Sequence, residues 1–164
     1  MDRIESVGIR RAGVDDIAAL KRVEVVALRA TNVFVAERDW EGLFDDGAVF
    51  TYLAEDENPF GYVTVGKPRE NWFQDGVTGE VISLCVLPEY QGKGVGRRLL
   101  VHGLSVLKRR QFEHALVWIR EGARRGERLL TTLGFTTFDS VRTINLTDGE
   151  ITQYAWTLSL ENYF

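Results

Sequence analysis

Apolar residues recur along the chain with two alternating periods, the two-residue period of strands and the 3.6-residue period of helices. Residues 6–12 have the composition of a short strand, and the apolar positions after them have helical spacing behind an N-cap at Asp15 or Asp16. Those apolar positions are Ile17, Leu20, Val23, Ala27 and Leu28. A second, shorter helical segment is expected over residues 36–44. The chain therefore begins with a strand followed by two helices.

A hairpin and a long strand are predicted next. The apolar runs at residues 48–55 and 60–66 flank the turn DENP, which predicts an antiparallel hairpin. The run GEVISLCVL at residues 79–87 is rich in β-branched and apolar residues and predicts a central strand covered on both faces. Pro88 ends this strand, because proline cannot donate to a strand ladder.

The rest of the chain alternates helix and strand again. Beyond the segment QGKGVG the pattern becomes helical, and residues 114–121 then predict another strand. Residues 123–135 predict a helix that closes at a C′ glycine, Gly134. Two final runs, residues 136–146 and 150–160, bracket TDG and predict a second hairpin. The fold class is therefore mixed α/β.

Composition narrows the classes of protein to which the chain can belong. It has 164 residues, of which 45% are hydrophobic and 27% charged, so it has the size and profile of one soluble globular domain over residues 1–164. The formal net charge of −4 disfavours a nucleic-acid partner. No apolar run approaches the ~20 residues that span a bilayer, and the N-terminus carries charges where a signal peptide is apolar. A single cysteine allows no internal disulfide, so we expect a cytoplasmic protein without a membrane partner.

The segment QGKGVG lies between the predicted central strand and the helix that follows it. Glycines let a backbone approach a ligand closely and adopt the positive φ values that turn N–H groups inward. The first N–H groups of a helix have no intrahelical partner and lie at the positive end of its dipole. Lys93, Arg97 and Arg98 add positive charge to the same turn. The segment therefore predicts a site for a phosphate or pyrophosphate group.

The spacing of the glycines indicates which kind of phosphate site this is. It is neither the GxxxxGK(S/T) of a P-loop nor the GxGxxG of a dinucleotide-binding loop. It resembles motif A of the GNAT family of N-acetyltransferases, Q/R-x-x-G-x-G/A, and the order of predicted elements is similar to that family over nearly the whole chain. The resemblance implies the acyl-CoA N-acyltransferase fold, a central mixed sheet of six to seven strands with about four helices. It also implies an enzyme that moves an acetyl group from acetyl-CoA to a small-molecule or peptide amine, by direct transfer in a ternary complex and without a metal.

The resemblance implies contacts with acetyl-CoA in two segments. The motif would hold the pyrophosphate through its amides and side chains. Its residues are Gln91, Gly92, Lys93, Gly94, Val95, Gly96 and Arg97. In this family the preceding strand separates from its neighbour, so the backbone near Leu84, Cys85 and Val86 would pair with the pantetheine arm like an added strand. The side chains of that strand are expected in the core.

Acetyl transfer also needs an acceptor for the proton of the attacking amine and a donor for the departing thiolate. Glu80 lies eleven positions before Gln91, the separation at which many family members carry a catalytic glutamate; the alternative is a solvated charge at a strand end. Leu130 stands where many relatives have a proton-donating tyrosine. The thiolate then leaves unaided, or another hydroxyl protonates it, from Thr131, Tyr90 or Tyr154. The alternative function is a catalytically silent domain that binds acyl-CoA or regulates another protein.

The other reactive side chains have simpler explanations. Cys85 has no histidine at a partner spacing and is expected to be a small buried hydrophobe rather than a nucleophile. The lone histidines His102 and His114 are expected to be packing or surface residues. The sequence therefore predicts no metal site.

Charged segments bear on the coenzyme and on the acceptor. The basic run at residues 108–111 is expected to be solvated; the alternative is that it, or Arg124 and Arg125, meets the 3′-phosphate of CoA. Acidic residues in and before the second helix slightly favour a cationic acceptor. They are Glu37, Asp39, Glu41, Asp45 and Asp46. The strands of the final hairpin offer an edge for a homodimer.

Overall fold

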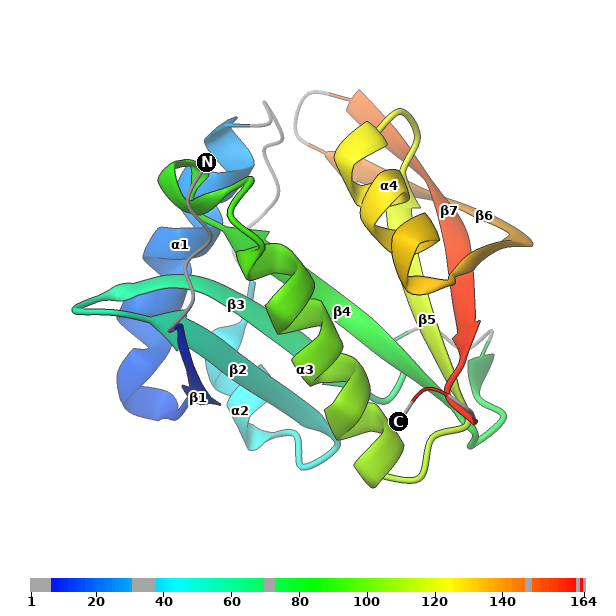
Figure 1. Cartoon of the computed structure of the whole chain (residues 1–164), viewed down its shortest axis with the longest axis horizontal. Helices are drawn as coiled ribbons and strands as arrows, with labels where there is room; N and C mark the ends of the chain where they lie inside the picture. The colour runs from blue at the N-terminus through cyan, green and yellow to red at the C-terminus, as the bar shows by residue number, and fades with distance from the viewer. Residues whose placement is uncertain (1–6, 31–37, 70–72, 147–148, 162, 164) are drawn as a thin grey trace.

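In the part of the chain that the structure describes, the strands form one seven-stranded mixed sheet in the order β1-β2-β3-β4-β5-β7-β6 (Figure 1). This computed structural model describes residues 7–30, 38–69, 73–146, 149–161 and 163. The strands are β1 (Gly8–Arg11), β2 (Val49–Glu55), β3 (Pro59–Gly66), β4 (Thr78–Val86), β5 (His114–Arg120), β6 (Thr136–Leu146) and β7 (Gly149–Ser159). Neighbouring strands are antiparallel except for β4 and β5, which are parallel. The predicted mixed sheet of six to seven strands is confirmed.

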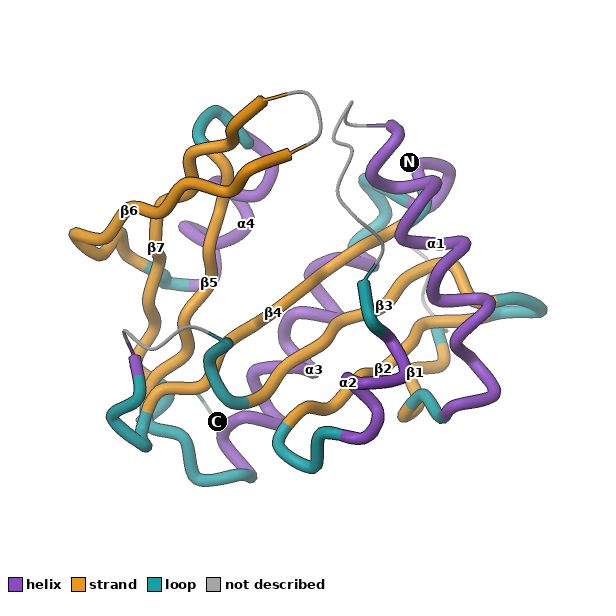
Figure 2. The backbone as a smooth tube through the Cα atoms, turned by 180° about the vertical axis from the view of Figure 1, so that it is seen from behind, coloured by secondary structure: helices purple, strands orange, loops and turns teal. Residues whose placement is uncertain are grey.

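Helices cover both faces of this sheet. α3 (Val95–Arg109) and α4 (Arg124–Leu133) lie on the face seen in Figure 1, and α1 (Ile17–Ala30) and α2 (Trp40–Asp45) lie on the opposite face, seen in Figure 2. α1 and α3 bury the apolar stripes that their sequences predict, with Leu20, Val23, Leu99 and Leu104 all 0% exposed. Fully burying one such side chain contributes about 1.5–3 kcal/mol, so these stripes fix both helices on the sheet.

The pairing between β4 and β5 ends early. Their parallel ladder runs from Thr78 opposite His114 to Val81 opposite Val117. Beyond that point β4 continues beside β3 alone and β5 continues beside β7, so the two strands diverge, as Figures 1 and 2 show. A bulge accompanies the divergence, because Val81 and Ser83 face consecutive residues of β3 and Ile82 is the extra residue. The sheet therefore opens at its centre.

Two details refine the sequence-based expectations, and a third confirms one. The second helix begins at Trp40 because the Asp39 carboxylate caps it, accepting the N–H of Gly42 at 3.0 Å; residues 36 and 37 lie outside the described residues. Both-face coverage of the central strand holds only for residues 78–81, and residues 82–85 are half-buried because β5 has diverged. α4 ends as predicted at Gly134, which has a φ of 95°. Residues 147 and 148 of the predicted final turn also lie outside the described residues.

Candidate active site

A cavity of about 210 Å³ lies where β4 and β5 separate. It is lined by residues 81–84 of β4, residues 117–119 of β5, Leu100 of α3, and Leu129 and Leu130 of α4. Among the described residues no strand pairs with the β4 edge that faces this cavity beyond Val81. The edge of β4 therefore offers backbone donors and acceptors to an extended ligand in the opening.

The glycine-rich loop lies at one end of this opening, directly before α3. Gly92 and Gly94 have φ values of 74° and 86°, in the left-handed region that glycine adopts without strain. Gly94 is the N-cap of α3, no side chain caps this end of the helix, and its first turn contains no acidic residue. The N–H groups of the first turn therefore have no intrahelical acceptor and lie at the positive end of the helix dipole. This arrangement is suited to an anion, as the sequence predicts.

Gln91 connects the loop to both sides of the opening. Its amide nitrogen donates to the carbonyl oxygen of Val86 at 2.9 Å, which ties the loop to the end of β4. Its amide oxygen accepts a hydrogen bond from Nη1 of Arg125 in α4 at 3.1 Å. Arg125 is therefore a further cation beside the loop, contributed by α4, and the sequence contains no local signal for this contact with Gln91. The ammonium of Lys93 lies 5.8 Å from the Tyr90 ring centroid.

Glu80 is buried in the last paired segment of β4, just before the opening. The residue is only 3% exposed, so Glu80 is not a solvated charge at a strand end. The carboxylate oxygen Oε2 accepts the backbone N–H of Arg69 at 2.9 Å, so the carboxylate has a defined orientation. Gly79, its neighbour, faces α3, since an added Cβ would press on Leu107; Glu80 therefore faces the side of the sheet that α1 and α2 cover.

A second buried carboxylate lies on the same face of the sheet. Oε2 of Glu24 in α1 accepts the hydroxyl of Tyr62 at 3.0 Å and Nε of Arg38 at 3.1 Å. The Tyr62 hydroxyl also lies 3.1 Å from Oγ of Ser83, a residue of the cavity lining. Glu24 is only 7% exposed. A sequence signal for it existed, because Glu24 stands at helical spacing within the buried stripe of Leu20 and Ala27.

None of the three hydroxyls considered for thiolate protonation lines the cavity. Leu130 does line it but has no proton to give. The Thr131 hydroxyl donates to the Glu127 carbonyl at 2.8 Å, and the Tyr90 hydroxyl donates to Asp56 at 3.1 Å. Tyr154 lies on β7, is 37% exposed and is absent from the cavity lining. The α4 residues that line the cavity, Gly126, Leu129 and Leu130, therefore have no polar side chain.

Cys85 is half-buried in β4, so it is less enclosed than the buried position that the sequence predicts. Burial raises the pKa of its thiol, against smaller opposing effects from the hydroxyls of Tyr62 and Ser83, so the thiol stays protonated and is a weak nucleophile. His102 is half-buried on α3, with its ring centroid 4.5 Å from that of Tyr52, and burial lowers its pKa. Among the described residues no cluster of histidine, cysteine and acidic side chains has the arrangement of a metal site. None of the helices described there is long and apolar enough to cross a bilayer.

Three of the acidic residues expected near the acceptor make local contacts. Asp39 caps α2, and Glu41 lies 3.8 Å from the ammonium of Lys21. The carboxylate of Asp46 accepts the N–H of Ala48 and pairs with Arg69 at 2.7 Å, and these two contacts lower its pKa. Glu37 lies outside the described residues. Asp39 and Asp46 therefore hold local structure, and Glu41 forms an exposed ion pair.

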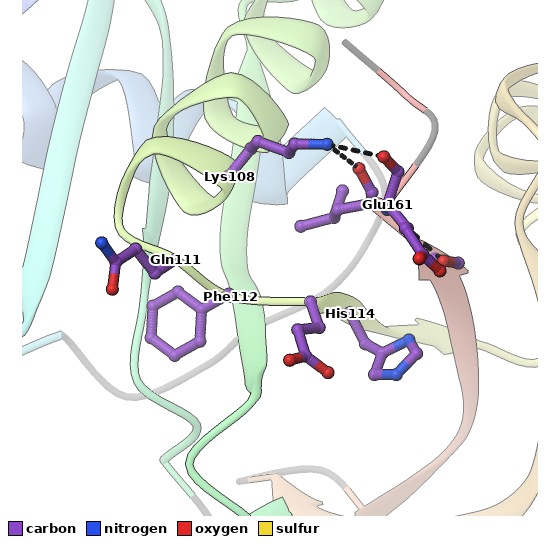
Figure 3. Close-up of a pocket in the computed structure, with 8 residues that line it drawn as sticks. Lys108, Gln111, Phe112, His114 and Glu161 are labelled. Atoms are coloured by element: carbon purple, nitrogen blue, oxygen red, sulfur yellow. Dashed lines mark hydrogen bonds between the residues drawn. The ribbon is translucent and has the colours of Figure 1, made fainter.

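A larger cavity of about 360 Å³ lies away from the glycine-rich loop (Figure 3). It is bounded by the last turn of α3, the start of β5 and the end of β7, and it includes His114 and Glu113. The ammonium of Lys108 donates to the carbonyl oxygens of Leu160 at 2.5 Å and Glu161 at 2.9 Å. This lysine is therefore bound to backbone, and none of the motif residues lines the cavity. The opening between β4 and β5 is the candidate active site.

The chain is similar to known proteins in sequence and in fold. The model of the Acetyltransferase (GNAT) family matches residues 17–135. The N-acetyltransferase YuaI of Bacillus subtilis is 29% identical over 130 residues, which cover 70% of this chain and 72% of YuaI. The ribosomal-protein-S18-alanine N-acetyltransferase of Escherichia coli has a TM-score of 0.76 at 18% identity, covering 97% of this chain and 99% of its own. The structure of yncA from Salmonella typhimurium with its cofactor acetyl-CoA has a TM-score of 0.75 at 21% identity, covering 98% and 97%. Both structures share the fold of this chain.

Proposed function

Because the chain belongs to the Acetyltransferase (GNAT) family, we propose that it transfers an acetyl group from acetyl-CoA to an amine while both substrates are bound. The observation that carries this proposal is the opening between β4 and β5, which begins after Val81 and leads to the glycine-rich loop before α3. The yncA structure, which has the same fold, was determined with acetyl-CoA. The acceptor is a small-molecule amine or a peptide amine; the Escherichia coli enzyme is named for an alanine of a ribosomal protein.

The residues around the opening fit an acyl-CoA. The amides from Gly92 to Arg97, together with the side chains of Gln91 and Lys93, would hold the pyrophosphate, since the left-handed glycines and the helix N-terminus favour an anion there. The free edge of β4, at Leu84, Cys85 and Val86, would pair with the amides of the pantetheine arm. When bound, acetyl-CoA supplies an acetyl thioester whose carbonyl carbon the amine attacks.

Glu80 is the proposed base. An alkyl amine has an ordinary pKa near ~10 and must lose a proton before its nitrogen can attack. The Glu80 carboxylate is held in one orientation by the Arg69 N–H, next to the point where β4 and β5 separate, and it can take this proton through a water. Leu130 gives the α4 side no proton donor, so the thiolate leaves unaided, which a thiol pKa near ~8.5 permits.

One observation favours a second candidate function. Leu130 is 3% exposed and presents only methyl groups where many family members have a tyrosine. A chain that keeps the coenzyme site but lacks this hydroxyl can also be a domain that binds acyl-CoA without transferring the acyl group.

Two measurements on wild type and Glu80→Gln separate these functions. The first is the binding of CoA and acetyl-CoA by titration calorimetry, and the second is release of free CoA with an alkylamine, a polyamine and a peptide with a free N-terminus. We expect an amine to stimulate release by the wild type, and Glu80→Gln to lower kcat about 10²- to 10⁴-fold with an unchanged Kd for CoA. Binding without stimulation by any amine would favour the silent domain. A Kd above ~1 mM, about 4 kcal/mol of binding, would reject the coenzyme site itself.

A further inference from the structure

The hydrogen bonds between Ser83, Tyr62 and Glu24 have a defined direction. A carboxylate paired with an arginine accepts hydrogen bonds, so the single proton of the Tyr62 hydroxyl is donated to Glu24. The contact of 3.1 Å between the two hydroxyls is then donated by Ser83, because Tyr62 has no second proton. Ser83 therefore uses its only proton toward the protein interior, and its oxygen keeps lone pairs that can accept a hydrogen bond from a third group.

The neighbouring groups support this direction. Burial raises the pKa of Tyr62, with added effects from Cys85 and Glu24, so its hydroxyl stays protonated and able to donate. The alternative acceptor for Ser83 is the Cys85 sulfur, which lies 3.9 Å away and is a weak acceptor when protonated. The chain of hydrogen bonds thus runs from Ser83 through Tyr62 to Glu24.

The bulge in β4 places Ser83 on this face of the sheet. Before the bulge, Gly79 and every second residue after it face α3, so regular alternation would turn position 83 toward α3 as well. The extra residue, Ile82, reverses the alternation. Ser83 consequently shares the face of Glu80 and Tyr62, which α1 packs against (Figure 2). Ser83 is also part of the cavity lining, two positions beyond the last residue of β4 that pairs with β5.

We propose that Ser83, oriented by Tyr62 and Glu24, positions the acceptor amine by accepting one of its N–H groups. This inference rests on the proposed acetyl transfer. The nitrogen attacks in its neutral form, after giving its first proton to Glu80; as it bonds to the acetyl carbon, the carbon–sulfur bond breaks and the sulfur keeps the bonding electron pair. The nitrogen is then positively charged, and it passes its second proton through water to the thiolate, which becomes the thiol. A hydroxyl dipole that ends in a buried carboxylate stabilises the positive charge on the nitrogen throughout.

A purely structural role does not require the complete series of hydrogen bonds from Ser83 through Tyr62 to Glu24. Arg38 already pairs with Glu24 at 3.1 Å, with side chains 30% and 10% exposed, so the carboxylate has an opposite charge without Ser83. The ring of Tyr62 packs edge-on against Trp40 with centroids 5.1 Å apart, and this contact does not need the hydroxyl. Removing the hydroxyl of Tyr62 therefore breaks this series of hydrogen bonds while keeping the packing of its ring against Trp40.

The test compares Ser83→Ala, Ser83→Thr, Tyr62→Phe and the double variant Ser83→Ala/Tyr62→Phe with wild type. Tyr52→Phe is the control, since Tyr52 is a partly buried tyrosine of β2 that contacts His102 and does not line the cavity. With the most active amine among the alkylamine, polyamine and peptide probes, kcat/KM for the amine should fall about 10- to 100-fold in Ser83→Ala and in Tyr62→Phe, the range for one hydrogen bond to a charged group. Ser83→Thr and Tyr52→Phe should stay within about threefold of wild type.

Two further readouts distinguish positioning from stability. The Kd for CoA by calorimetry should be unchanged in all variants. The double variant should lose no more activity than Tyr62→Phe alone, because both changes interrupt the same series of hydrogen bonds. An active wild type with Ser83→Ala at full kcat/KM overturns this inference and leaves the proposed function intact. The inference is also overturned if kcat/KM falls as far in Tyr52→Phe as in Ser83→Ala, or if the losses of the two single variants add in the double variant. A wild type that binds CoA but acts on no amine overturns the inference and the transferase function together.

Discussion

Replacing Gly94 with aspartate should strongly weaken CoA binding while it leaves the fold nearly unchanged. Gly94 is the N-cap of α3 and has a φ of 86°, and an added Cβ would meet no other atom within 4 Å. The protein itself therefore has room for the side chain. The new carboxylate would lie at the loop that we propose to hold the pyrophosphate.

The effects on folding cancel only in part. A left-handed conformation costs a residue other than glycine about 1–2 kcal/mol. Aspartate in place of glycine at an N-cap returns only a few tenths of a kcal/mol, although no other side chain now caps this helix. The free energy of unfolding should fall by about 1–2 kcal/mol, a decrease of about 2–8 °C in Tm for a chain of this length.

No such compensation applies to the binding of CoA. A carboxylate about 4 Å from one phosphate charge is repelled by ~1 kcal/mol in bulk water and ~4 kcal/mol near a protein surface. The Kd for CoA should therefore rise about 10- to 1,000-fold. Gly94→Asn is the matched control, because asparagine also caps helices and tolerates the left-handed region but carries no charge.

The assay is titration calorimetry with CoA for wild type, Gly94→Asp and Gly94→Asn at low and high salt, with thermal unfolding of each protein. The difference in Kd between the aspartate and asparagine variants should shrink at high salt, because salt screens charge repulsion. A wild-type Kd in Gly94→Asp would show that the pyrophosphate binds elsewhere. Equal losses in both variants at every salt concentration would show that the side chain blocks the site and that charge is irrelevant.

Three other changes test the coenzyme site, the packing and the acid stability. Arg125→Gln should raise the Kd for CoA about 2- to 10-fold at low salt, and by less at high salt, because it removes a cation beside the loop. The measurement is calorimetry, and an unchanged Kd at low salt would show that Arg125 does not contribute to CoA binding. Gly66→Ala should lower the free energy of unfolding by about 1–3 kcal/mol in urea, because the new Cβ would press on the carbonyl oxygen of Ala48; wild-type stability would contradict this. Arg10 lowers the pKa of Asp16 below its ordinary 3.8, so this pair stabilises the fold above pH 3.8 and the stabilisation is lost as the pH falls through the lower, folded-state pKa. Arg10→Gln should therefore lower Tm at pH 6 and approach wild type at the acid end, and a constant difference across the pH range would refute the linkage.

Features that depend on neighbours in the sequence were predictable. The helical spacing of Leu20 and Val23 and the C′ glycine at Gly134 act within a few residues, so the sequence alone places these elements correctly. The glycines at positions 92 and 94 adopt the positive φ values that a phosphate loop needs. The fold and the position of the loop follow from such local signals.

The chemistry of the opening depends on contacts that no local pattern contains. Tyr62 reaches Glu24 across 38 positions and Ser83 across 21, and Arg125 reaches Gln91 across 34. Each of these side chains has an ordinary local explanation, as a strand residue, a helix residue or a surface charge. Which of them meet is decided by the packing of α1 and α4 on the sheet.

The sequence by itself determined the order of elements, the glycine-rich loop before α3 and the apolar residue at Leu130, because periodicity, glycine and residue type are local properties. The tertiary structure decided that β7 enters between β5 and β6, and that β4 and β5 part after Val81. It also decided that one extra residue, Ile82, turns Ser83 toward Tyr62. These outcomes rest on strand pairing and register, since a shift of one residue reverses the face on which every later side chain lies.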